Sequence, residues 1–225
     1  MDKTQIRNAA TIILLRDRDS EPKVLMGQRG KTAAFMPNKF VFPGGALDEQ
    51  DSQVSLARPI NADCLRRLRA KADAGVAEAL VLAAIRELWE ETGLLLGQKG
   101  DAGQNGGVPE AWQSFYQSGV QPSGAGIRFV FRAITPPGRP RRFDARFFLA
   151  DADCISGSLD DFTHASDELS HLQWIALSEA RNFDLPFITE VVLAEIAAGL
   201  KSGESDQSVP FFFNEADTSY FDRLI

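Results

Sequence analysis

One stretch, residues 83–94, constrains the fold more than any other part of the chain. It places Glu87, Glu90 and Glu91 at positions i, i+3 and i+4 of a helix-forming run, so their carboxylates project from one face. Like charges at this spacing repel, so such a face either lies in water or is offset by cations. Taken alone, it is typical of a solvated surface. The run stops at Gly93, a common residue just beyond a helix end. The opposite side carries the apolar residues that dock a helix on a core, namely Leu82, Ile85, Leu88 and Trp89.

The composition limits the kinds of partner that the chain can have. Its 225 residues carry a formal charge of −7, and 44% of them are apolar. This acidic balance argues against nucleic-acid and anionic-membrane binding, since both need a positive surface. We expect one domain, residues 1–225, in the cytoplasm, because there is no leader pattern and no apolar run reaches the roughly 18 residues that span a bilayer. A usual Cys/His metal site is excluded by the spacing of Cys64, Cys154, His164 and His171.

Hydrophobic patterns and turn residues predict an α+β fold with a mixed sheet between helical layers, because strands and helices do not alternate regularly. Residues 46–75 are interpreted as an insertion and 97–107 as a mobile surface loop. A C-terminal extension at 201–225 ends in an aromatic tail that we expect to pack on the body or on a second subunit. Strands are predicted at 9–17, 23–29, 40–42, 127–134, 142–150 and 170–177, and helices at 63–71, 76–92, 109–118 and 185–200.

A turn and a carboxylate upstream of the acidic run change its interpretation. The turn is Phe-Pro-Gly-Gly at 42–45, and Glu78 stands eight positions before Arg86. With residues 83–94 they resemble the Nudix box, whose pattern is glycine, five residues, glutamate, seven residues, then Arg-Glu-aliphatic-any-Glu-Glu-any-Gly-aliphatic. The second half matches at every specified position. Gly45, however, lies 33 positions before Glu78 where the pattern has 6, so 27 residues (33 less 6) are inserted. The resemblance implies a Nudix-type α/β/α sandwich with a mixed sheet.

The resemblance also implies metal-dependent cleavage of a pyrophosphate bond. Carboxylate oxygens suit Mg²⁺ or Mn²⁺, and Glu87, Glu90 and Glu91 are expected to hold one to three such ions. The ions would neutralise phosphate oxygens and lower the pKa of a water that attacks phosphorus. In Nudix proteins a backbone carbonyl of the glycine turn also reaches a metal, a role that falls here to Gly44.

Four further residues are expected to support the acids. Arg86 would orient them by pairing with a carboxylate of the box, for which Glu78 is the expected partner. As a surface ion pair, Arg86 would contribute little. Gly45 permits close backbone approach, and Gly93 ends the helix.

The general base is left open between several side chains. Glu90 and Glu91 come from the box, and Glu168 occupies a late acidic position just before a predicted strand, where it could also be an ordinary turn residue. His164 and His171 could titrate near neutral pH, but a lone histidine is more often structural.

The substrate is predicted more broadly than the reaction. Residues 24–29, 35–37, 42–45 and 144–150, together with the insertion, resemble the acyl-CoA diphosphatase branch of Nudix hydrolases, which cleaves CoA or its thioesters to 3′,5′-ADP and a phosphopantetheine. Four basic residues could meet the phosphates of such a substrate, or could only solubilise loops. They are Arg29, Lys31, Lys39 and Arg146.

Other functions stay open at this point. ADP-ribose, dinucleotides or modified nucleotides would use the same chemistry. A Nudix-like nucleotide-binding regulatory module without catalysis is a rival of another class, although the presence of all the box acids argues against it. The aromatic tail is a candidate homodimer interface.

Overall fold

The computed structural model describes residues 5–33, 35–73, 75–100, 107–202, 208–215 and 218–225. Within these residues the main sheet has nine strands and a smaller sheet has three. The main sheet contains β1 (Ile6–Arg16), β2 (Lys23–Arg29), β3 (Phe40–Val41), β4 (Gly44–Ala46), β7 (Arg128–Ile134), β8 (Arg142–Asp151), β10 (Leu169–Ala176), β11 (Val209–Glu215) and β12 (Thr218–Leu224). The smaller sheet contains β5 (Leu95–Lys99), β6 (Val120–Pro122) and β9 (Ile155–Ser156).

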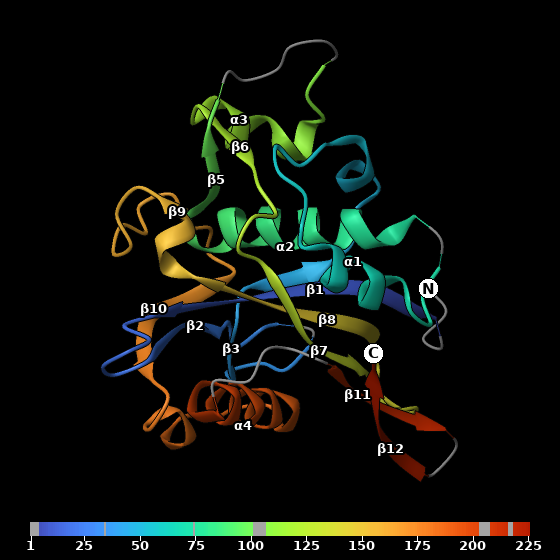
Figure 1. Ribbon diagram of the computed structural model, residues 1–225. Helices are drawn as coiled ribbons and strands as arrows, with labels where there is room; N and C mark the ends of the chain where they lie inside the picture. The colour runs from blue at the N-terminus through green and yellow to red at the C-terminus, as the bar shows by residue number, and fades with distance from the viewer. Residues whose placement is uncertain (1–4, 34, 74, 101–106, 203–207, 216–217) are drawn as a thin grey trace.

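Helices lie on both faces of the main sheet, with α1 and α2 on one side and α4 on the other (Figure 1). Alternate residues of β1 enter two separate cores: Ile12 packs with the α2 side and Ile13 with the α4 side. The expected α+β sandwich with a mixed sheet is therefore confirmed. The helices are α1 (Ala62–Arg69), α2 (Val76–Thr92), α3 (Gln113–Gln117) and α4 (Phe187–Ser202), and the short 3₁₀ helices are η1 (Glu49–Gln53), η2 (Glu110–Trp112), η3 (Ala152–Cys154) and η4 (Ala180–Asn182).

The centre of the main sheet is a long parallel pair, β1 with β8, whose register runs from Ile6 opposite Arg142 to Leu15 opposite Asp151. The strands predicted at 9–17 and 23–29 pair antiparallel as β1 and β2, and β7 pairs antiparallel with β8. β4 pairs with β1 on the edge opposite β8. This pairing brings Gly44 and Gly45 to the face that α2 covers.

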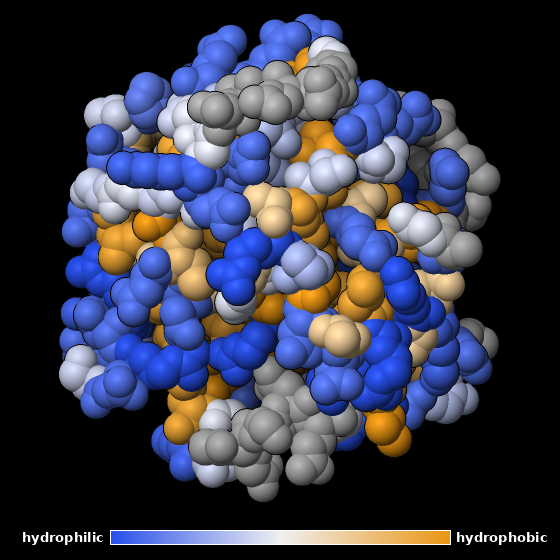
Figure 2. Space-filling view, turned by 45° about the horizontal axis from the view of Figure 1, so that its top comes forward, coloured by the Kyte–Doolittle hydropathy of each residue, from blue (hydrophilic) through white to orange (hydrophobic). Residues whose placement is uncertain are grey.

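The helix α2 is buried on almost every side, which corrects the expectation of a helix that displays its acids. Its buried residues include Glu87 and Glu91, because β4 and η1 pack on the acidic face. On the side turned forward in Figure 2, hydrophobic residues are interrupted by hydrophilic ones and form no continuous apolar face. The apolar residues of α2 therefore stay covered by the elements that pack around it.

The segments around the core follow the predictions with two changes. The predicted insertion carries α1 as expected, but it begins with the short helix η1. The predicted loop at 97–107 starts within β5, while residues 101–106 lie outside the described part. The aromatic tail packs back on the body as β11 and β12, an antiparallel hairpin whose first strand pairs in parallel with β7. In the described residues no helix is long and apolar enough to cross a membrane.

Candidate active site

The glycine turn presses directly on the acidic end of α2. A Cβ on Gly45 would overlap the carboxylate of Glu87, and a Cβ on Gly44 would overlap the carbonyl oxygen of Ala10. The backbone N–H of Gly44 donates to Oε2 of Glu91 at 2.8 Å. A side chain at position 44 would therefore push β4 away from β1, and one at position 45 would displace the carboxylate of Glu87.

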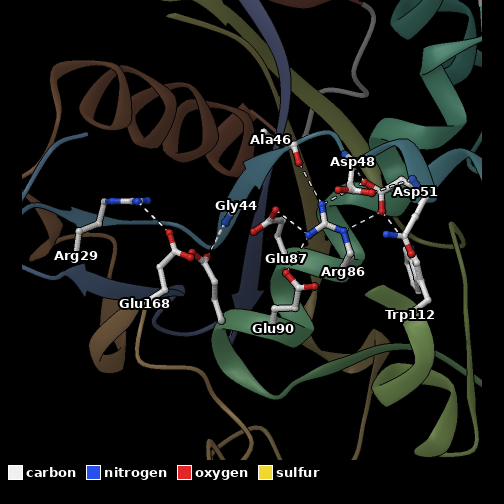
Figure 3. Close-up of polar contacts among 12 residues, drawn as sticks. Arg29, Gly44, Ala46, Asp48, Asp51, Arg86, Glu87, Glu90, Trp112 and Glu168 are labelled. Atoms are coloured by element: carbon white, nitrogen blue, oxygen red, sulfur yellow. Dashed lines mark hydrogen bonds and ion pairs between the residues drawn. The ribbon is translucent and has the colours of Figure 1, made fainter. Parts of the chain in front are cut away.

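Arg86 is the centre of a buried network that holds the acids in place (Figure 3). Its Nη1 donates to Glu87 and to Glu90, each at 2.9 Å. Its Nε and Nη2 donate to the two carboxylate oxygens of Asp51 at 2.8 and 3.1 Å, and Nη2 also reaches the carbonyl oxygen of Ala46. The indole of Trp112 donates to Asp51 as well. Asp51 thus holds the guanidinium group in place through Nε and Nη2, and Nη1 orients the carboxylates of Glu87 and Glu90.

The prediction that Arg86 pairs with Glu78 is wrong. Glu78 pairs with Arg69 at 2.8 Å in an exposed bridge, while Asp51 takes the buried position beside Arg86. Asp51 stands six residues after Gly45, the spacing that the Nudix pattern gives its first acid. The extra residues therefore lie between this acid and α2. The spacing was visible in the sequence, but an aspartate in place of a glutamate hid it.

Negative charge exceeds positive charge in this cluster. Burial raises the pKa of Glu87 to about 7, although Arg86 opposes the shift. Burial and then the charge of Glu87 raise the pKa of Glu91 well above its usual range, and burial raises that of Glu90. The second carboxylate oxygen of Glu91, Oε1, is buried without a hydrogen-bond partner. A cation would relieve both the repulsion and the missing contact.

The same surroundings stabilise the charged form of Arg86, whereas they destabilise the charged forms of Glu87 and Glu91. Burial alone would lower its pKa, but the hydrogen bonds with Asp51 and the charges of Glu87, Asp51 and Glu90 together raise it. The guanidinium stays charged and fully paired, which keeps the acids oriented.

Glu168, in the turn before β10, and Arg29, at the end of β2, border the same cluster. They form an ion pair at 3.0 Å, and the charge of Glu168 contributes to the raised pKa values of Glu87 and Glu91. The sequence predicted both residues for the site, and the structure brings them to its edge (Figure 3).

Three other predicted residues do not join the carboxylates. Lys39 pairs with Asp184, next to α4, and Lys31 is exposed in the turn after β2. Arg146 is 1% exposed and donates to Asn8 and to the carbonyl oxygen of Asp144. The prediction that Arg146 contacts a substrate at the acidic cluster is therefore wrong, because its side chain is buried between the sheet and the helices that cover it.

The two histidines have structural surroundings. His164 lies against Trp89 with the rings 5.7 Å apart and would contact a Cβ on Gly93. His171 interrupts the pairing of β10 with β2 at a bulge and has a positive φ of 52°. Among the described residues, as their side chains are placed, no three or more acidic, histidine or cysteine residues converge closely enough to enclose a metal ion.

The chain is similar to known proteins both in sequence and in structure. The family model described as NUDIX domain matches residues 6–195. The curated protein "Putative nudix hydrolase 7" of Caenorhabditis elegans is 31% identical over 182 residues, which cover 77% of this chain and 52% of that protein. The chain thus spans about half the length of this relative.

Two solved structures share the fold. The crystal structure of a NUDIX hydrolase from Alicyclobacillus acidocaldarius has a TM-score of 0.63 and 26% identity, covering 88% of this chain and 96% of that one. The NUDIX domain of Shewanella oneidensis NrtR, solved with ADP ribose, has a TM-score of 0.51 and 14% identity, covering 88% of this chain and 90% of that one. At this identity the second likeness concerns the fold alone.

Proposed function

Because the chain belongs to the Nudix family, we propose that it hydrolyses a pyrophosphate bond, with Mg²⁺ or Mn²⁺ as cofactor, in a nucleoside diphosphate linked to another group. The match between the acidic run, the glycine turn and the buried Arg86 network supports this reaction. A non-catalytic nucleotide-binding module would not need so many carboxylates to be held together against their repulsion.

The observation that carries the proposal is the buried carboxylate of Glu91. It accepts one hydrogen bond from Gly44, leaves Oε1 without a partner and lies within the field of Glu87. A buried acceptor without a partner is costly, and an all-oxygen set of donors fits a hard divalent cation. The proposed ligands are Glu87, Glu90, Glu91 and the carbonyl of Gly44.

A bound Mg²⁺ or Mn²⁺ ion would neutralise the phosphate oxygens and lower the pKa of a water. The residues of the chain supply the positioning. Arg86 fixes Glu87 and Glu90 through one nitrogen, and each glutamate keeps a second oxygen that does not bind Arg86. Glu90 has a side chain that is 40% exposed, so it faces the approach from solvent.

Three carboxylates are candidates for the general base. Glu90 and Glu91 belong to the cluster itself, and Glu168 reaches it from the turn before β10. Glu168 has the advantage that Arg29 holds it at the edge, at 3.0 Å, where it can meet a water without being a metal ligand.

CoA or an acyl-CoA is the first substrate that we propose, giving 3′,5′-ADP and the corresponding phosphopantetheine. Arg29 at the edge of the cluster, with Lys31 and Lys39 on the loop that follows β2, would bind its phosphates. ADP-ribose, dinucleotides and modified nucleotides are the alternatives within the same reaction.

The decisive experiment is mass spectrometry of the products from a mixed panel of CoA, acyl-CoA, ADP-ribose and dinucleoside polyphosphates, with Mg²⁺ or Mn²⁺. We expect 3′,5′-ADP from the CoA compounds. Glu90→Gln and Glu91→Gln should lose the activity, and excess chelator should abolish it. A parent rate retained in these variants would refute the metal ligands, and a full rate in chelator would refute metal dependence.

A further inference from the structure

A second charged cluster lies on the face of the main sheet that α1 and α2 cover, on the far side of β1 from the glycine turn. Asn8 on β1 is paired with Asp144 on β8, and Arg146 on β8 is paired with Arg132 on β7. Directly paired side chains lie on one face of a sheet, and like charges in such a pair repel. Two arginines in register therefore need a counter-charge between them.

The counter-charge within this buried set is a single carboxylate. Arg132 binds both oxygens of Asp144, at 2.9 and 2.7 Å, and Nη1 of Arg146 shares one of them at 3.0 Å. Both arginines and Asp144 are buried. Two guanidinium groups thus share one carboxylate in a place where water cannot screen their repulsion.

Arg146 is the less satisfied of the two arginines. Burial, with the charge of Arg132, lowers its pKa to about 10 in spite of Asp144 and Asp73. Its Nη1 donates to Asn8 and to a backbone carbonyl, but its Nε is buried with no hydrogen-bond partner. An arginine that keeps a free N–H inside a protein has a donor available for a ligand.

This cluster opens into a polar pocket of about 360 Å³. Asp73 and Lys71 stand at its exposed rim, and Lys71 also pairs with Asp222 of β12. The ring of Phe211 lies against Arg132, with 4.4 Å from the guanidinium carbon to the ring centroid. The sheet, the inserted segment and the C-terminal hairpin therefore all meet at this pocket.

We propose that this pocket binds a phosphoryl group, as free phosphate or as the terminal phosphate of a monoester, against Arg146. Phosphate oxygens accept from guanidinium N–H groups in pairs, and a dianion supplies the charge that one carboxylate does not. The site is separate from the acidic cluster and does not rest on the proposed hydrolysis.

The test is a titration of the full chain with inorganic phosphate, in excess chelator so that no divalent cation can recruit phosphate to the acidic cluster. Isothermal calorimetry measures the affinity, and the Nε–Hε signal of Arg146 in ¹H–¹⁵N spectra reports the location. The variant Arg146→Lys, which lacks this group, assigns the signal. We expect saturable binding, and a shift of the Arg146 signal that follows it.

Asn8→Asp is the sharpest variant, because it keeps the shape of the side chain and puts a carboxylate next to Arg146. The added charge should weaken phosphate binding at least tenfold, which corresponds to about 1.4 kcal/mol. The matched control is Asn182→Asp, an exposed position with the same change of net charge, and it should bind as the parent does. Circular dichroism and thermal melting check that each variant is folded.

Three outcomes would overturn the proposal. They are no saturable binding of phosphate by the parent, binding without a shift of the Arg146 signal, and equal affinities of Asn8→Asp and the parent. A parallel titration with a nucleoside 5′-monophosphate separates the two sources of the group: equal affinity indicates free phosphate, and tighter binding indicates that the pocket also holds the esterified part.

Discussion

Arg86 and Arg146 are almost equally buried, at 5% and 1% exposure, yet their surroundings are opposite. Arg86 is bound by three carboxylates, and its pKa is raised. Arg146 shares one carboxylate with a second arginine, and its pKa is lowered. Burial alone therefore says little about what a charged residue does. The balance of charge around it is the basis of the cation site that we propose in the first case and of the anion site that we propose in the second.

The largest effect should come from removing the anchor of Arg86. Asp51→Asn leaves a buried guanidinium with less compensation, and breaking such a pair costs about 3–5 kcal/mol of the free energy of unfolding. Hydrolysis should also fall, since Glu87 and Glu90 lose their fixed support. Urea unfolding measures the loss. Glu78→Gln, in the exposed bridge with Arg69, is the control and should change stability by less than about 1 kcal/mol. If both variants lose similar amounts of unfolding free energy, Asp51 is not the main partner of Arg86.

The next effect tests the other arginine cluster. Asp144→Asn removes the one carboxylate that Arg132 and Arg146 share, so we expect a loss of about 3 kcal/mol. Phosphate should restore part of this stability, because a ligand that binds only the folded state adds about 1.4 kcal/mol for each tenfold excess over its Kd. Thermal melting with and without phosphate gives the answer. Asp184→Asn, which breaks the surface pair with Lys39, should show neither the loss nor the rescue.

A third substitution should separate activity from stability. Glu91→Gln removes a proposed metal ligand, and a loss of several kcal/mol of transition-state stabilisation is roughly a hundredfold or greater fall in kcat. With metal chelated, the same variant should be more stable than the parent by about 1 kcal/mol, because a buried charge in a repulsive cluster is gone. Kinetics and melting on one preparation test both. If Glu91→Gln is less stable than the parent and still active, Glu91 is neither a metal ligand nor part of a repulsive cluster of charges.

The last prediction measures the contrast between the two clusters directly, through ligand binding alone. Mg²⁺ at a hundredfold excess over its Kd should stabilise the parent by about 2.7 kcal/mol, and it should leave Glu91→Gln nearly unchanged. Phosphate without metal should respond to Asn8→Asp and not to Glu91→Gln. If one ligand loses its effect in both variants, the two clusters are not independent sites.

Much of the fold followed from local patterns. The strands at 9–17, 23–29, 127–134 and 142–150 and the helix at 76–92 were predictable because hydrophobic period and turn residues agree there. The parallel pairing of β1 with β8 was not, because it joins distant segments that carry no mutual signal. The strand β5 and the hairpin of β11 and β12 were missed for the same reason.

The site was predictable where the spacing is local. Glu87, Glu90 and Glu91 are fixed by helical geometry, whereas the choice of Asp51 over Glu78 depends on how η1 folds back on α2. Arg146 was assigned by its charge alone. Its alternation with Asp144 and Phe148 along a predicted strand already placed it on an inner face.

The parallel pair at the centre of the sheet has a consequence for the order of events during synthesis. The helix α2 ends at Thr92 and β8 begins at Arg142, so the ribosome completes this helix 50 residues before the strand that closes the sheet beneath it. Contacts between such distant segments form late and slow the folding of a domain. During that interval β1, which packs against α2, lacks its long parallel partner β8. The nascent chain should therefore be most prone to aggregation, and most dependent on chaperones, between the synthesis of residues 92 and 151.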